Sequence, residues 1–222
     1  MKVGTLSDGS KGFDANRRID AASAQTAYAM GYRFAVRYIR RDPVNPRDVT
    51  PGEMCTLLEA GLGVMVVQHV AAEDHWTPTP GLGTQYGSTA VAECNRIGLP
   101  RGVSVWLDLE GVAPGTAAQD AIDYCNRWYD AVAGAGYAAG TYVGWHAGMS
   151  GEQLYRKLKC PRFWGAYNAN ADQAPIRRGF QMRQRSATAA DRFPLVAHDS
   201  DFDVNVINAD ALGGSPSLLL PG

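Results

Sequence analysis

The sequence predicts an α/β fold, a single domain in which eight strands close into a barrel. Strand-like and helix-like segments alternate over most of the chain, which is typical of a parallel sheet whose strands are joined by helices. The apolar run at residues 64–68 fits a strand that is covered on both faces. A length of 222 residues is also typical of one barrel domain.

The first part of the chain contains three strand–helix units. Strands are expected at residues 12–15, 34–39 and 64–68, and helices at residues 21–30, 50–60 and 84–97. Gly31 and Gly61 follow the first two helices, at the position where glycine commonly ends a helix. Thr50, Pro51 and Glu53 form a capping box at the start of the second helix.

The second part continues this pattern and then changes it. Two more units are expected, with strands at residues 103–110 and 140–143 and helices at residues 118–132 and 151–159. The helix at 118–132 is the clearest, since its apolar residues recur at 4-3-4-3 spacing. Three strands without long helices between them follow at residues 163–167, 179–184 and 202–206. Five strand–helix units and three further strands give eight strands, enough to close a barrel.

The expected domain boundaries are an N-terminal extension (residues 1–11), the barrel (12–212) and a flexible tail (213–222). The tail begins with Gly-Gly-Ser-Pro-Ser, a composition typical of linkers. The first ten residues contain no apolar core of a signal peptide, and no stretch approaches 18 apolar residues. We therefore expect synthesis in the cytoplasm without a signal peptide, and no integral contact with a membrane.

Composition argues against several classes of partner. A net charge of −1 and a pI of about 6.4 give no electrostatic basis for binding nucleic acid or an anionic membrane. Cys55, Cys94, Cys125 and Cys160 are widely spaced, which favours buried free thiols in a reducing cytosol, with disulfides or a metal site as the alternatives. Motifs for a zinc protease, a serine nucleophile or a dinucleotide are missing, so no metal or other cofactor is expected. We expect a monomer.

The tripeptide Asp108-Leu109-Glu110 ends the fourth expected strand. Residues two apart on a strand share a face, so Asp108 and Glu110 project side by side while Leu109 points the other way. Burial and mutual repulsion raise the pKa of at least one of the two carboxyl groups. A protonated acid beside an ionised partner is what glycosidic bond cleavage requires. A strand-end cap, a metal ligand or a salt-bridge position would explain the same tripeptide.

Four acidic residues are expected at the mouth of the barrel, where barrel enzymes place their chemistry. Asp14 lies on the first strand and Asp203 on the eighth, and these strands are neighbours across the seam, so the two residues are expected to face each other. Asp108 and Glu110 lie on the opposite side of the mouth. Four carboxyl groups in one apolar cavity are costly for folding but useful for catalysis.

These motifs resemble a known family. The segments at 12–14 (Gly-Phe-Asp), 108–110 (Asp-Leu-Glu), 179–181 (Gly-Phe-Gln) and 203–205 (Asp-Val-Asn) resemble, in this order, the family 25 glycoside hydrolases, lysozymes of the Chalaropsis type. Over residues 11–210 the chain is more similar to a related branch, the glycoside-hydrolase-like domain of unknown function 1906. The segments that carry this second resemblance are 31–39, 64–69, 105–111 and 140–145.

The resemblance implies a single TIM-like barrel of (β/α)5β3 type and a glycan partner. Its activity would be cleavage of the β-1,4 bond between N-acetylmuramic acid and N-acetylglucosamine in peptidoglycan. By position, Glu110 would be the general acid that protonates the leaving oxygen. Asp108 would support the acetamido group or the developing cation, with Asp203 assisting from the opposite wall. Asp14 would orient the substrate or Glu110.

Candidate substrate-binding residues surround these motifs. Trp76, Trp164 and Tyr167 fall in loops or near strand ends, where aromatic rings can grip sugars, and core packing is the alternative. His69 ends the third strand and could contact the substrate or a carboxylate, or serve a structural hydrogen bond. Trp106 shares the parity of Asp108 and is expected inside the barrel. The remaining candidates are Arg37, Tyr38, Gln68, Gln181 and Asn205.

Two segments depart from the lysozyme pattern. Residues 37–41 read Arg-Tyr-Ile-Arg-Arg, where those lysozymes typically carry a lysine and then an acidic residue. The loop at 74–80 is also distinct. Both lie near the mouth, so an endoglycosidase for a different polysaccharide and a non-catalytic glycan-binding barrel stay open as alternatives. As a muramidase the protein would act at the cell wall, delivered by phage lysis or by a secretion or injection system.

Overall fold

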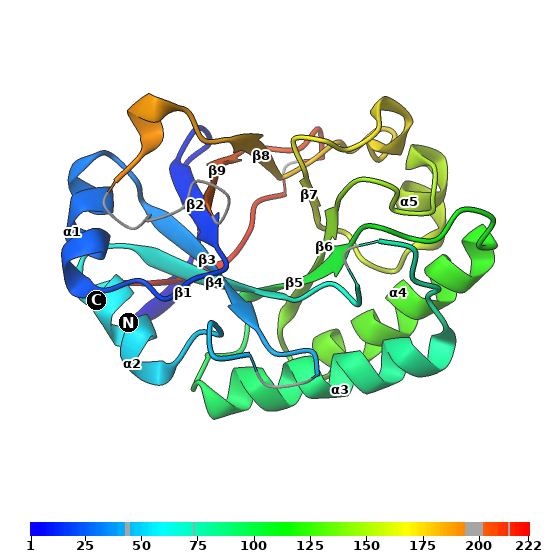
Figure 1. Cartoon of the computed structure of the whole chain (residues 1–222), viewed down its shortest axis with the longest axis horizontal. Coiled ribbons are helices and arrows are strands. Elements are labelled where there is room, and N and C mark those ends of the chain that lie inside the picture. Colours follow the sequence, from blue (N-terminus) through cyan, green and yellow to red (C-terminus); the bar gives the residue numbers. More distant parts are fainter. Residues whose placement is uncertain (43–44, 73, 194–201, 213) are drawn as a thin grey trace.

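The computed structural model describes residues 1–42, 45–72, 74–193, 202–212 and 214–222. Within these ranges, eight strands close a barrel with helices on its outside (Figure 1). The barrel strands are β2 (Lys11–Ala15), β3 (Phe34–Ile39), β4 (Gly63–Gln68), β5 (Ser104–Leu109), β6 (Ala138–Val143), β7 (Phe163–Gly165), β8 (Met182–Ser186) and β9 (Phe202–Ile207). The predicted (β/α)5β3 barrel is therefore confirmed, with strand boundaries that differ by at most three residues.

One strand of the barrel runs opposite to the other seven. Strands β2 to β8 run in the same direction, and the pairing of β4 with β5 closes the ring on that side. Strand β9 lies between β8 and β2 and runs antiparallel to both. The start of β9 therefore lies at the same end of the barrel as the carboxyl ends of the other strands.

Five α-helices and two short 3-10 helices connect the described strands. They are α1 (Ala21–Ala29), α2 (Pro51–Glu59), α3 (Pro80–Arg96), α4 (Ala118–Gly134), α5 (Gly151–Lys157), η1 (Ala171–Gln173) and η2 (Ala189–Asp191). The long helices α3 and α4 lie side by side (Figure 1), and Gly87 lets them approach because a Cβ there would lie 2.8 Å from the Cβ of Ala131. No helix in the described ranges is long and apolar enough to cross a bilayer.

The predicted capping box at the start of α2 forms only in part. The Thr50 side chain accepts a hydrogen bond from the Glu53 backbone N–H, as expected of an N-cap residue. The Glu53 carboxylate does not return to Thr50, because it instead accepts from the Arg37 guanidinium and from the Ile19 backbone N–H. Helix α2 is thereby attached to β3 and to the start of α1.

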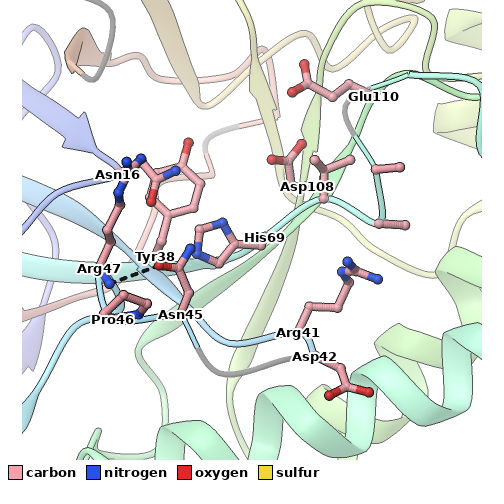
Figure 2. A pocket seen from close by; sticks show the side chains of 13 residues that line it. Asn16, Tyr38, Arg41, Asp42, Asn45, Pro46, Arg47, His69, Asp108 and Glu110 are labelled. Carbon is pink, nitrogen blue, oxygen red and sulfur yellow. Dashed lines mark hydrogen bonds between the residues drawn. The ribbon is translucent and has the colours of Figure 1, made fainter. Parts of the chain in front are cut away.

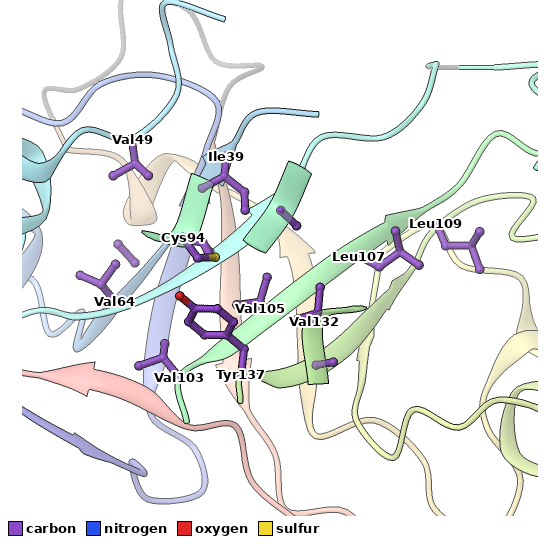
Figure 3. Close-up of a cluster of buried hydrophobic side chains, with 14 of the residues drawn as sticks. Ile39, Val49, Val64, Cys94, Val103, Val105, Leu107, Leu109, Val132 and Tyr137 are labelled. Carbon is purple, nitrogen blue, oxygen red and sulfur yellow. The ribbon is translucent and has the colours of Figure 1, made fainter. Parts of the chain in front are cut away.

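Apolar side chains form two layers. The outer layer fills the space between the strands and the helices, and Figure 3 shows part of it, including Val105, Leu107 and Leu109 of β5. The inner layer fills the barrel and contains Trp106, as predicted. Gly140 on β6 makes room for this indole, since a Cβ there would lie 3.1 Å from Trp106 Cδ2 and closer still to other ring atoms.

The two ends of the chain close the bottom of the barrel. Strands β1 (Lys2–Gly4) and β10 (Leu218–Leu220) pair antiparallel, and β10 also pairs with the start of β4. Leu218 is fully buried in the inner layer. The prediction of a flexible tail is thus wrong for β10, because the apolar run at the C-terminus packs into the barrel; residue 213 lies outside the described residues.

All four cysteines are free thiols. Cys94, Cys125 and Cys160 are buried, as predicted, whereas Cys55 is exposed on α2. Burial raises the pKa of the Cys94 thiol to about 12 and holds the pKa of the other two buried thiols above the usual range. These thiols are structural, since low-pKa cysteines are the reactive ones.

Candidate active site

A cavity of about 590 Å³ opens at the carboxyl ends of β3, β4 and β5. Figure 2 shows Asp108 and Glu110 on one side of it and Asn16, Tyr38 and His69 on the other. The described residues that line it are Asn16, Tyr38, Arg41, Asp42, Asn45, Pro46, Arg47, His69, Val70, Ala71, Ala72, Asp108 and Glu110. The end of the barrel is the one at which the sequence placed the site.

The parity of β5 orients the tripeptide as predicted. Leu107 and Leu109 pack in the outer layer, whereas Asp108 points into the barrel and is 5% exposed. Glu110 follows the last residue of the strand and lines the cavity. Its backbone carbonyl accepts a hydrogen bond of 2.6 Å from the Trp76 indole N–H. This hydrogen bond from Trp76 therefore holds the backbone at Glu110, directly after the end of β5.

Gly144, which follows β6, leaves the space that the Glu110 side chain occupies. A Cβ at residue 144 would lie 2.5 Å from Glu110 Cβ and 3.1 Å from its Cδ, and closer still to Oε2. The backbone N–H of Gly144 donates to the Leu109 carbonyl at 3.0 Å, so the two strand ends are held together. The absence of a side chain on Gly144 thus sets where the Glu110 carboxyl group lies.

Asp14 and Asp203 face each other, as predicted, because they are directly paired across β2 and β9. Opposed residues of an antiparallel pair point to the same face. Asp203 lies near the start of β9 rather than at its carboxyl end. It still reaches the mouth, because β9 runs antiparallel to its neighbours.

Asp14 is the hub of a hydrogen-bond network. Its Oδ2 accepts from the side-chain amides of Gln184 (3.0 Å) and Asn205 (2.8 Å), and its Oδ1 lies 3.5 Å from the donating Tyr38 hydroxyl. Gln184 in turn accepts from the Tyr142 hydroxyl at 2.9 Å. The structure therefore brings the predicted residues Tyr38 and Asn205 to the site and adds Gln184.

Three carboxyl groups at the mouth have raised pKa values. Burial is the largest cause in each case and raises the pKa of Asp14 to about 6 and that of Asp203 to about 7. The pKa of Asp108 lies well above its usual range, through burial first and then through the neighbouring charges of Glu110 and Asp14. Asp108 Oδ1 is buried and has no hydrogen-bond partner among the described residues. Raised pKa values favour the protonated form of these acids, which suits a site for acid–base chemistry.

His69 borders the cavity on the side of β3 and β4. Its Nε2 lies 2.7 Å from Asp48 Oδ1, and its ring packs 4.7 Å from that of Tyr38. His69 is therefore placed in the cavity wall, with the ring held by Asp48. In the described part of the chain, no group of three or more His, Cys, Asp or Glu side chains is arranged to hold a metal ion.

Three predicted substrate-binding residues lie elsewhere. Arg37 is fully buried outside the barrel, where it pairs with Glu53 at 2.6 Å and donates to the backbone carbonyl of Ala15. Gln68 is buried beneath α3 and α4 and accepts from the Trp128 indole at 2.8 Å. Gln181 lies at the opposite end of the barrel, where it donates to Asp210 at 2.8 Å. All three are structural, and their assignment to the site was wrong.

Two of the three aromatic residues that were predicted to bind sugar rings are buried in the core. Trp164 is buried inside the barrel, with its ring 4.5 Å from that of Tyr142. Trp76 is buried against Tyr124, its ring 5.1 Å away. Both follow the alternative of core packing. Tyr167 is 56% exposed, as a sugar platform requires, but lies outside the set of residues that line the cavity.

Several residues of the site were missed by the sequence analysis. Asn16 lies two residues after Asp14, and that spacing is the same signal that paired Asp108 with Glu110. Gln184 lies two residues after Met182, whose side chain packs inside the barrel. Arg41, Asn45 and Arg47 come from the irregular segment after β3, where no periodicity indicates direction.

Solved structures with the same fold include bacterial proteins and lytic enzymes. The Tat-secreted protein Rv2525c of Mycobacterium tuberculosis, in complex with L-tartrate, superimposes with a TM-score of 0.63 at 16% identity, over 90% of this chain and 96% of that one. A lysozyme of Streptomyces coelicolor gives 0.59 at 18% identity, over 95% and 94%. The catalytic domain of endolysin ply40 from Listeria monocytogenes phage P40 gives 0.61 at 15% identity, over 93% and 96%.

At these identities the likeness concerns the fold alone. No curated protein matches the chain in sequence. The family model described as "Rv2525c-like, glycoside hydrolase-like domain" does match it, over residues 25–207. That range contains Asp108, Glu110 and Asp203 and ends at the last residue of β9. The chain belongs to the family of Rv2525c-like glycoside hydrolase-like domains.

Proposed function

We propose that the protein is a glycoside hydrolase that cleaves β-1,4 bonds of bacterial peptidoglycan as an N-acetylmuramidase. The observation that carries the proposal is the convergence of Asp14, Asp108, Glu110 and Asp203 on the mouth of the barrel. Asp14 and Asp108 are buried, and burial raises the pKa of these two carboxyl groups and of Asp203, so that gathering acidic groups here costs stability. A cluster of this kind is characteristic of acid–base catalysis.

In this reaction Glu110 protonates the glycosidic oxygen, the bond from that oxygen to C1 breaks, and positive charge develops on the sugar ring. Asp108 hydrogen-bonds the acetamido group beside C1, and Asp203 stabilises the developing charge from the opposite wall. A water molecule then adds to C1 and returns its proton to the site. Asp14 holds the side chains of Gln184, Asn205 and Tyr38 in place by accepting their hydrogen bonds.

The family and the lytic enzymes among the structural relatives support a glycan substrate. Fold likeness by itself does not carry an activity, so the support for hydrolysis comes from the carboxyl groups. If the substrate is peptidoglycan, the protein acts at the bacterial cell wall.

One observation favours a second candidate, an endoglycosidase for a different acidic polysaccharide. Arg41, in the segment at residues 37–41 that departs from the lysozyme pattern, lines the cavity, and so does Arg47 from the chain that follows. Positive side chains in the cavity wall suit a glycan with anionic substituents. The two candidates use the same carboxyl groups and differ only in the glycan.

A glycan panel tests the proposal. Purified peptidoglycan, chitin oligosaccharides and uronic-acid polysaccharides are incubated with the protein, and new reducing ends are identified by mass spectrometry. The proposal predicts fragments ending in reducing N-acetylmuramic acid from peptidoglycan. Cleavage of another polysaccharide alone would support the second candidate, and binding without cleavage of any glycan would leave a carbohydrate-binding barrel.

A further inference from the structure

Arg41 differs from the two arginines that precede it in the same segment. Arg37 pairs with Glu53 at 2.6 Å, and Arg40 pairs with Glu93 at 3.3 Å. Among the described residues Arg41 has no acidic partner. Its Nη1 donates to the Tyr86 hydroxyl at 3.0 Å, and its buried Nε has no hydrogen-bond partner in that part of the chain. Arg41 is thus a partly buried cation whose charge is not balanced by a neighbouring carboxylate.

The guanidinium group of Arg41 is held in place from behind. Its central carbon lies 5.0 Å from the centroid of the Tyr86 ring, in a cation–π arrangement. Tyr86 is buried on α3, and its backbone carbonyl accepts from the Gln68 amide at 2.9 Å. An arginine held in one place loses less conformational entropy when it binds a ligand. This support leaves the cavity side of the guanidinium for an external partner.

Because of its position, Arg41 is expected to contact a different part of a bound molecule than the acidic residues do. Arg41 lines the same cavity as Asp108 and Glu110, and Figure 2 shows its side chain at the edge opposite Asn16 and Arg47. An anion placed among the carboxyl groups would be repelled. An anion at Arg41 would instead belong to a substituent of the bound molecule, away from the bond that is cleaved. A planar guanidinium matches a carboxylate with two parallel hydrogen bonds.

We propose that Arg41 binds a carboxylate carried by the glycan, so that the site selects an acidic, carboxylate-bearing glycan over a neutral one. The inference rests on the proposed function in that the glycan occupies this cavity. In peptidoglycan the carboxylate has two sources: the lactyl group of a sugar without a stem peptide, and the stem peptide itself where its amide bond has consumed the lactyl carboxylate.

Binding is measured in the Glu110→Gln background, so that turnover does not consume the ligand. Three oligosaccharides of equal length serve as probes: peptide-free strands with free lactyl carboxylates, the same strands with these groups reduced to alcohols, and strands that carry stem peptides. We expect the preferred acidic strand to bind about 10- to 100-fold more tightly than the reduced one. Preference for the peptide-free strand assigns the lactyl carboxylate, and preference for the peptide-bearing strand alone assigns the stem.

Arg41→Gln is expected to abolish this preference while leaving the Kd of the reduced strand within about twofold, which also shows that the variant is folded. Arg41→Lys retains part of the preference, because it keeps the charge and loses the planar fork. Arg156→Gln is the control: it removes a positive charge from the exposed pair with Glu152, away from the residues that line this cavity, and should leave the preference intact.

Equal binding of acidic and reduced strands by the Arg41-containing protein would overturn the inference. So would an equal effect of Arg41→Gln on both strands, or equal effects of Arg41→Gln and Arg156→Gln. An Arg41-dependent preference in a protein that cleaves no glycan would refute the proposed hydrolysis and leave this inference standing.

Discussion

Gly144 provides a sharp test of how the acid is positioned. In Gly144→Ala, the new methyl carbon would lie 2.5 Å from Glu110 Cβ and 3.1 Å from Cδ. Carbon atoms that are not bonded approach to about 3.5–4.0 Å, so Glu110 must move by about 1 Å. The backbone at Gly144 is not in the left-handed region, so the methyl group itself is the perturbation.

A displacement of about 1 Å at a catalytic group costs about 100-fold in rate. We therefore expect kcat on peptidoglycan to fall about 100-fold in Gly144→Ala, with a loss of stability of about 1–3 kcal/mol from overpacking. Initial rates are followed by the clearing of a peptidoglycan suspension, and stability by urea denaturation. Gly134→Ala at the end of α4 is the control, since a Cβ there meets nothing within 4 Å.

The control should retain the rate and the stability of the wild type. A Gly144→Ala protein with the kcat of the wild type would show that catalysis does not depend on the space that Gly144 leaves for the Glu110 side chain. A loss of rate in both variants would point to a general effect of added methyl groups.

Three further predictions concern stability. Asp203→Asn should become more stable relative to the wild type as the pH rises from 4.5 to 8. In the wild type, a carboxyl group with a folded pKa of about 7 keeps its proton where the unfolded chain has lost it, and its stabilising contribution is lost as the pH rises through 7. Urea denaturation at both pH values checks this, and a constant difference in stability between the two proteins contradicts it. Glu53→Gln should lower the free energy of unfolding by about 3–5 kcal/mol, measured by chemical denaturation, since it leaves the buried Arg37 charge uncompensated. Glu152→Gln, in the exposed pair with Arg156, should lower it by less than about 1 kcal/mol. Similar losses for both variants would show that burial does not matter for the Arg37–Glu53 pair. Leu218→Ala should cost about 2–5 kcal/mol because it opens a void in the barrel, against less than about 0.5 kcal/mol for the exposed Leu212→Ala, and equal thermal shifts would mean that β10 does not support the barrel.

The sequence predicted the barrel well because the alternation of apolar segments sets strand and helix identity. It predicted the acidic cluster for the same reason: the spacing of Asp108 and Glu110 places both on one face, and the neighbourhood of the first and last barrel strands opposes Asp14 to Asp203. These inferences need only local parity and strand order.

The errors also have a physical basis in parity. Gln68 and His69 are consecutive, as are Arg37 and Tyr38, so only one residue of each pair can face the site. In both pairs the structure selects His69 and Tyr38. Strands of a covered barrel are apolar on both faces, so the sequence does not reveal which parity points inward. Alternation along a strand excludes one residue of each pair from the site, but it does not indicate which one.

Other features depend on contacts far apart in the chain. Leu218 packs in the barrel because β10 pairs with β1 and β4, and the Gly-Ser-Pro composition before it gave no indication of this pairing. Arg41 reaches the cavity from an irregular segment, and its support comes from Tyr86 on α3. Such contacts arise only when the barrel closes.

The central claim is that Glu110 acts as the acid in peptidoglycan cleavage. The most direct measurement is digestion of purified peptidoglycan by the wild type and by Glu110→Gln, with product reducing ends identified by mass spectrometry. We expect muropeptides ending in N-acetylmuramic acid from the wild type and their loss in Glu110→Gln, whose fold is preserved. Equal product yields from both proteins, or none from the wild type, would contradict it.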